Sequence, residues 1–173
     1  YGLMKLAARA PLPVHCMIRP RSGGFSYGEA DLAQMLHDID MARDLGLAGV
    51  VFGALTDEGA LDSHVLQRLS RHAAGLDLTL HRAFDCCGSD FDRAVDTAIE
   101  LGFDRVLTSG GENTALEGLA ALERIFAKAG TRITIMPGSG VSADNVSTIA
   151  TRLPVREIHA SCSTAFPVSA AAE

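Results

Sequence analysis

Residues 80–90, LHRAFDCCGSD, concentrate reactive side chains directly after the apolar run Leu76–Leu80. The groups are the imidazole of His81, the guanidinium of Arg82, the carboxylate of Asp85 and the thiols of Cys86 and Cys87. A guanidinium can hold a carboxylate or phosphate through two hydrogen bonds, and an imidazole moves protons near neutral pH. We therefore predict a ligand site in which Arg82 clamps an anion, His81 is the acid/base, and Asp85 either orients His81 or is itself the base. The alternative is that Arg82 and Asp85 form an ion pair that holds the loop, with His81 a buried, hydrogen-bonded side chain.

The two adjacent thiols raise a second hypothesis, a metal site. Copper(I) prefers soft ligands such as thiolates, and imidazole also binds copper. His159 follows another apolar run and could join the thiols from a neighbouring strand end. The candidate metal ligands are therefore Cys86, Cys87 and His159. The alternative is that these are reduced thiols without a metal, because adjacent side chains diverge in regular backbone.

Arg19 follows the predicted strand Val14–Ile18 and could also bind an anion. Side chains alternate along a strand, so Cys16 lies on the opposite face from His15 and Arg19. We expect Arg19 to point toward the ligand and Cys16 to be a buried structural thiol. The alternative for Arg19 is a structural ion pair with a carboxylate.

Two glycine-rich loops each join a predicted strand to a predicted helix, at 109–111 and 137–140. Glycine lets backbone N–H groups turn toward a ligand, so these loops could hold a phosphate or a similar anion. The candidate residues for binding such a group are Ser109, Gly110, Gly138, Ser139 and Gly140. The alternative is that both loops are ordinary turns, because neither matches a complete P-loop.

Short apolar runs alternate with helical patterns along the chain, which indicates one α/β domain over residues 1–173. The predicted strands are Val14–Ile18, Gly49–Phe52, Leu76–Leu80, Arg105–Thr108, Arg132–Met136 and Arg156–Ala160. Four glycines, Gly46, Gly75, Gly102 and Gly130, stand where helices are expected to end. Two capping boxes are expected, at Ser26–Glu29 and Thr114–Glu117. The segments DLGLAGVVFG (44–53) and ELGFDRVLTS (100–109) repeat one pattern, consistent with two units of a parallel βα alternation.

Polar or glycine-rich residues follow every predicted strand. In a closed barrel the carboxyl ends of all strands meet at one end, the mouth, whereas an open sheet gathers its chemistry at one switch point. This pattern favours a parallel (β/α) TIM-type barrel over an open doubly wound sheet. Only six of the eight strands are found, so we expect the first two strands and the last helix to be missing from the chain.

Composition narrows the choice of partners and compartment. The net charge of −6 argues against binding to nucleic acid or to an anionic membrane surface. No apolar run approaches the roughly 18 residues of a membrane span. The four cysteines have no CxxC spacing, which favours a reducing, cytoplasmic location.

The segments HCMIRPRSGGFSY, LHRAFD, LGFDRVLTSGG, IMPGSGV and REIHAS occur here in this order. Together they resemble the CutC copper homeostasis family, and the resemblance covers residues from about 1 to 161. It implies a cytoplasmic (β/α)₈ barrel that forms a homodimer, and a link to copper. In this family, cysteines in the first two strands are plausible ligands for a thiophilic metal, and the resemblance implies that this chain lacks those strands.

Three classes of function remain open. The first is a copper-binding protein of copper homeostasis, which rests on the resemblance. The second is an enzyme that acts on a small phosphorylated or carboxylated metabolite at the mouth of the barrel. The third is a scaffold without catalysis, because a fold does not prove a function.

Overall fold

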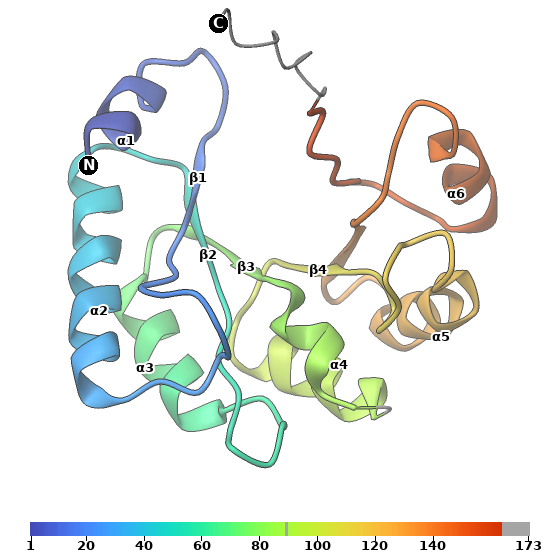
Figure 1. The fold of residues 1–173 in the computed structure, drawn as a ribbon, viewed down its shortest axis with the longest axis horizontal. Helices are drawn as coiled ribbons and strands as arrows, with labels where there is room; N and C mark the ends of the chain where they lie inside the picture. The colour runs from blue at the N-terminus through green and yellow to red at the C-terminus, as the bar shows by residue number, and fades with distance from the viewer. Residues whose placement is uncertain (89, 164–173) are drawn as a thin grey trace, which may run out of the picture.

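A computed structural model describes residues 1–88 and 90–163 (Figure 1). The strands are β1 (His15–Met17), β2 (Gly49–Phe52), β3 (Asp77–Leu80), β4 (Arg105–Thr108) and β5 (Thr134–Pro137). The helices are α1 (Gly2–Ala7), α2 (Glu29–Asp44), α3 (Ser63–His72), α4 (Phe91–Glu100), α5 (Leu119–Ala129) and α6 (Val146–Arg152), and a 3-10 helix η1 (Arg82–Cys86) follows β3.

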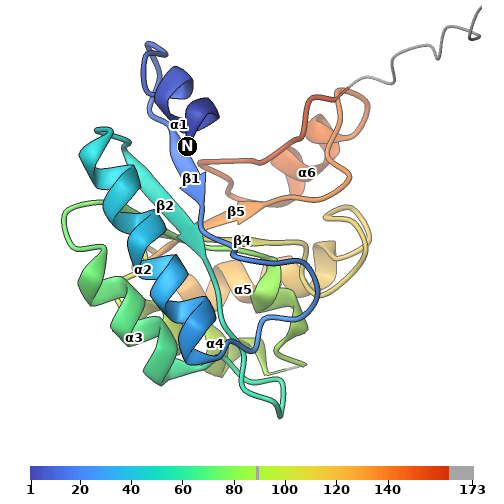
Figure 2. The same cartoon turned by 60° about the vertical axis from the view of Figure 1, so that its left-hand side comes forward.

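The five strands form one parallel sheet in the order β1-β2-β3-β4-β5, so each strand pairs with the next one in the chain. Register pairs place Gly49 opposite His15 and opposite Asp77, and Arg105 opposite Thr79. Helices α2 to α5 lie on one side of the sheet (Figure 2). This sequential order with helices on the outside is a partial (β/α) barrel, as the sequence predicts.

Alternation along the strands separates the two faces of the sheet. Phe52, Leu80 and Val106 are fully buried and pack with apolar residues of the helices into one core. Cys16 packs against the same core, which confirms its predicted outward orientation. The strand residues that alternate with these outward-facing ones, such as Met17, line a cavity on the opposite, inner face of the sheet. Burying one face of each strand against amphipathic helices supplies most of the favourable free energy of folding.

Most of the predicted helix ends are confirmed. All four predicted glycines have positive φ, which L-residues with a Cβ rarely adopt. Thr114 and Glu117 exchange the reciprocal hydrogen bonds of a capping box, at 3.0 and 3.2 Å. The capping box expected at Ser26 is wrong. Ser26 instead donates to Asp57, and Gly28 is the N-cap of α2, with its N–H donating to the carboxylate of Asp31.

The predicted sixth strand, 156–160, is not a strand in the part of the chain that the structure describes. A strand needs a repeated ladder of backbone hydrogen bonds. This segment makes one such bond with β5, from His159 N to Pro137 O at 2.9 Å. It therefore runs beside the end of β5 without extending the sheet. Among residues 1–88 and 90–163, no helix has the length and apolar character needed to cross a membrane.

Candidate functional site

Arg82 connects three loops at the carboxyl ends of the strands. Its Nε donates to Asp85 at 2.7 Å, its Nη1 to Ser139 Oγ at 3.0 Å, and its Nη2 to Ser109 Oγ at 2.8 Å. Nη2 also donates to the carbonyl of Glu112 at 3.1 Å. The loops after β3, β4 and β5 are therefore joined by one guanidinium. Its side chain is still 40% exposed, so a ligand can reach it.

Asp85 is the buried partner of this arginine, with a side chain only 6% exposed. Besides Arg82, its carboxylate accepts hydrogen bonds from the N–H groups of Ser109 and Gly111, each at 3.1 Å, and from the hydroxyl of Thr108. A carboxylate with this many donors is held in one orientation. Asp85 therefore positions Arg82 and the loop after β4, and the ion pair of the alternative interpretation is present.

In the glycine-rich loop after β4, backbone N–H groups donate to other groups of the protein. The N–H of Gly110 donates to Thr108 Oγ at 2.9 Å, and the N–H of Gly138 donates to the carbonyl of Thr108 at 3.0 Å. Together with Ser109, whose N–H binds Asp85, these predicted ligand-binding donors are already used within the protein. In effect, the carboxylate of Asp85 occupies the place that an anion would take in this loop.

The loop after β5 begins at Gly138, and it differs beyond that residue because the N–H groups of residues 139–141 have no partner in the described part of the chain. Ser139 has φ of 79°, a left-handed conformation that is uncommon for a residue with a Cβ, and Gly140 follows with φ of 65°. Ser139 Oγ accepts from Arg82 and donates to the carbonyl of Asn113 at 2.7 Å. Among residues 1–88 and 90–163 no partner is recorded for the N–H groups of Ser139, Gly140 and Val141. The structure thus places Ser139 in contact with Arg82, and Gly140 is the next residue of the same loop.

His81 lies at the end of β3 but is 4% exposed. Its Nδ1 accepts a hydrogen bond from the N–H of Ala83 at 3.1 Å, and its ring lies 4.8 Å from the ring of Phe25. Burial, with a smaller contribution from the positive charge of Arg19, lowers the pKa of His81 to about 4. The imidazole is therefore neutral at physiological pH, which argues against the predicted role of His81 as a general acid.

Arg19 is exposed and lies over the ring of Phe25, with 4.7 Å from its guanidinium carbon to the ring centroid. Its Nη2 donates to the carbonyl of Gly23 at 2.7 Å. Within the described residues no carboxylate lies within 4.0 Å of its nitrogen atoms, so the structural ion pair of the alternative interpretation is absent there. Arg19 remains a candidate for anion binding.

The three predicted metal ligands are not brought together. Cys86 is exposed, whereas Cys87 lines a small cavity on the helix side with Leu61 and Ala94. Burial, and then the neighbouring Cys86, raise the pKa of Cys87 to about 12, so its thiol is protonated at neutral pH. His159 lines the cavity on the inner face of the sheet. Among the residues described, no three His, Cys, Asp or Glu side chains are close enough together to hold an ion.

Sequence reasoning missed a group of charged side chains on the inner face, near the amino ends of the strands. We call His15, Asp77, Arg105 and Glu157 the inner-face cluster. Arg105 lies 2.9 Å from Glu157 and 3.6 Å from Asp77, and His15 lies 3.8 Å from Asp77. They line a cavity of about 520 Å³. The available signal was a charged or imidazole side chain at the first position of three strands, which alternation places on one face.

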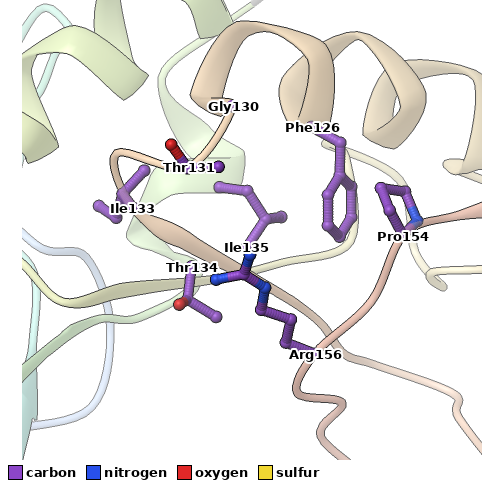
Figure 3. Close-up of a pocket in the computed structure, with 8 residues that line it drawn as sticks. All are labelled: Phe126, Gly130, Thr131, Ile133, Thr134, Ile135, Pro154 and Arg156. Carbon is purple, nitrogen blue, oxygen red and sulfur yellow. The ribbon is translucent and has the colours of Figure 1, made fainter.

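Another pocket, of about 280 Å³, lies at the opposite end of β5 from Ser139 (Figure 3). It is lined by Phe126, Ile133, Pro154 and Arg156 among others, and Figure 3 shows Arg156 reaching into it from the segment after α6. None of the predicted site residues lines this pocket. The candidate site is therefore the mouth formed by Arg82, Asp85 and the loops after β4 and β5.

A model of the CutC family matches residues 1–164. The chain belongs to the CutC family. The family protein CutC of Sinorhizobium medicae is 52% identical over 168 residues, which make up 97% of this chain and 68% of that protein. The family protein CutC of Agrobacterium fabrum is 50% identical over 162 residues, covering 94% of this chain and 64% of that protein. The chain thus spans about two thirds of the length of these CutC relatives.

Solved structures agree with this assignment to the CutC family. The protein from Streptococcus agalactiae that is provisionally named copper homeostasis protein CutC superposes with a TM-score of 0.88 at 34% identity, covering 92% of this chain and 79% of that one. An aldolase called QR15 superposes with a TM-score of 0.71 at 15% identity, over 91% of this chain and 72% of that one. The second likeness concerns the barrel fold alone.

Proposed function

We propose that this CutC chain binds a small phosphorylated or carboxylated metabolite at its mouth. The observation that carries the proposal is the guanidinium of Arg82, which three loops hold in one place while its side chain stays 40% exposed. A cation fixed before the ligand arrives loses little conformational entropy on binding. Arg82 is therefore preorganised for an anion.

The donors around Arg82 fit an oxygen-rich anion. An arginine has five N–H donors, and four hydrogen bonds are recorded for Arg82, so one N–H of Nη1 is left for a ligand. Nη1 is also the atom bound to Ser139, whose loop carries the unpartnered N–H groups of 139–141. A phosphate or carboxylate has enough acceptor oxygens to bind both. Arg19 contacts a carbonyl and an aromatic ring and has no carboxylate within 4.0 Å among the described residues, so its charge could add attraction for the anion.

Titration calorimetry with inorganic phosphate and with malonate tests the proposal. Wild type should show saturable binding, and Arg82→Lys should bind at least about tenfold more weakly, because lysine keeps the charge but not the fork of donors. Arg68→Ala is the matched control, because Arg68 makes an exposed ion pair with Glu29 on the helix layer. Absence of saturable binding in wild type, or equal affinity in Arg82→Lys, would contradict the proposal.

Copper binding is a second candidate, favoured by the provisional name of the Streptococcus agalactiae relative and by one structural observation. Two thioethers, Met17 and Met136, and two imidazoles, His15 and His159, line the same cavity on the inner face. Thioether and imidazole groups are ligands that copper(I) accepts. This set replaces the predicted cysteines as the candidate ligands for copper.

An anaerobic titration of copper(I) against a chromogenic chelator tests this second candidate. Replacing Met17 and Met136 by leucine should abolish retention of copper by the protein, whereas Cys86→Ser should leave it unchanged. Loss of binding in the serine variant alone would favour the predicted cysteine site instead. If neither copper nor anions bind, the scaffold without catalysis is the better interpretation.

A further inference from the structure

One polar atom at the mouth has no partner in the described structure: the Nε2 of His81 is buried and makes no hydrogen bond. Nδ1 of the same ring accepts the N–H of Ala83. An accepting ring nitrogen carries no proton, so in the neutral imidazole the proton is on Nε2. His81 therefore presents a buried N–H donor that is unsatisfied. An unpaired buried donor destabilises the protein, and a ligand acceptor would recover that loss.

The position of this donor follows from the strand. Asp77, Thr79 and His81 alternate onto the inner face of the sheet, and Asp77 and Thr79 line its cavity. On the neighbouring strand end, Gly53 leaves room for the ring, because a Cβ there would lie 2.6 Å from Nδ1 of His81. The imidazole is thus packed against the backbone on one side, and the ring of Phe25 covers it at 4.8 Å.

Phe25 is a cover that can move without moving its backbone. The carbonyl of Phe25 accepts a hydrogen bond from the N–H of Leu55 at 2.9 Å, which holds the main chain. The side chain is packed between the ring of His81 and the exposed guanidinium of Arg19. The side chain of Phe25 is partly buried against the hydrophobic core, and a change of its rotamer needs no movement of the main chain. An anion drawn to Arg19 would therefore arrive beside the ring that shields His81.

We propose that the side chain of Phe25 is a gate, and that a bound anion displaces it and accepts a hydrogen bond from Nε2–H of His81. His81 is then a neutral donor to the ligand and not a general acid or base. Burial of the imidazole, which lowers its pKa to about 4, agrees with this role. The inference rests on the proposed anion site and adds to it a second binding residue and its cover.

Three variants and one probe, inorganic phosphate, test the gate. His81→Asn keeps an oxygen that can accept the N–H of Ala83 but lacks the distal N–H, so it should fold normally and bind phosphate about two- to tenfold more weakly. Phe25→Ala should bind phosphate more tightly than wild type, because no ring has to be displaced. Phe25→Leu, which keeps apolar bulk, is its matched control and should resemble wild type. Unchanged affinity in His81→Asn or in Phe25→Ala would overturn the inference.

A second measurement separates this inference from the proposed function. Diethyl pyrocarbonate modifies accessible imidazoles, and peptide mapping resolves His81 from the other five histidines. We expect His81 to be protected in wild type and in Phe25→Leu and to react in Phe25→Ala. If no variant binds phosphate but this labelling pattern holds, the proposed anion site fails and the displacement of Phe25 by an anion fails with it, whereas the shielding of His81 by Phe25 is supported. Equal labelling of His81 in all three proteins would overturn the gate.

Discussion

Charged side chains are held in different ways at the two ends of the sheet. At the mouth, Asp85 is 6% exposed and is bound by backbone N–H groups and short hydroxyl side chains as well as by Arg82. At the amino ends, the carboxylates of Asp77 and Glu157 are 54% and 41% exposed and are joined by the long side chain of Arg105. The mouth is thus fixed by loop backbone, whereas the inner-face cluster depends on side chains that water also reaches.

This difference determines which end of the sheet can position another group accurately and which end tolerates substitution. A charge held by backbone donors cannot move without moving the loop, so it can place another group accurately. A charge held by side chains in contact with water contributes little and adapts to change. In barrels of this type the carboxyl end carries chemistry and the amino end carries stability. Four substitutions or titrations, taken from the largest expected effect to the smallest, test this contrast.

Asp85→Ala should have the largest effect, a loss of about 3–5 kcal/mol in the free energy of unfolding. The substitution leaves Arg82 and the N–H groups of Ser109 and Gly111 without their acceptor. Urea denaturation at neutral pH measures the change. Asp77→Ala, at the other end of the sheet, is the control. A cost for Asp85→Ala no larger than that of the control would show that the mouth is not fixed by this carboxylate.

His81 should make the stability of the protein fall with acid. Its pKa of about 4 in the folded state lies below the ordinary value of 6.5, so the unfolded state binds the proton more readily between these pH values. The contribution is fully present above pH 6.5 and is lost as the pH falls toward 4. Relative to His81→Asn, wild type should lose roughly 2–3 kcal/mol between pH 7 and pH 4. Parallel pH profiles for the two proteins would contradict the burial of the imidazole.

Arg105→Gln should cost about 1–2 kcal/mol, less than Asp85→Ala, because its partners stay hydrated when it is removed. It should also change His15. Burial, and then the charge of Arg105, lower the pKa of His15, so removal of that charge should raise it. Proton NMR titration of the imidazole measures this shift, and thermal denaturation measures the stability. A fall in the pKa of His15 would show that Arg105 is not close to it in solution.

Asp77→Ala should have the smallest effect, below about 1 kcal/mol. Its carboxylate is more than half exposed, and its contacts with Arg105 and His15 are 3.6 and 3.8 Å long. Added salt should reduce even this effect, since exposed ion pairs are screened. The midpoint of urea denaturation at low and high salt provides the measurement. A loss comparable to that of Asp85→Ala would remove the distinction between the two ends.

Much of the fold could be predicted from local patterns. Strands Gly49–Phe52 and Arg105–Thr108 have the predicted bounds, because each is an apolar run that begins where a glycine or a charged residue leaves the preceding turn. The helix ends at Gly46 and Gly130 follow from the need for positive φ. The prediction of a strand at 156–160 was wrong. The composition of this segment suits a strand, but its backbone contacts only the end of β5.

The candidate site could be predicted only in part. The spacing of Arg82 and Asp85 gave their pairing, but the sequence left open whether they bind a ligand or each other. The structure shows the pair together with Ser109 and Ser139, which come from loops 27 and 57 residues away in the chain. Phe25 carried no signal, because nothing local marks an aromatic ring as the cover of a histidine.

The sequence by itself determined the periodic elements, the parallel βα order, the outward face of Cys16 and the family. These depend on backbone geometry and on alternating burial, which neighbouring residues specify. The tertiary structure alone decided that Asp85 occupies the loop after β4, that Arg82 stays partly exposed, and that His81 is covered and neutral. Those outcomes depend on strand register and loop conformation, which bring together donors and acceptors from distant parts of the chain, and no short stretch of sequence contains that information.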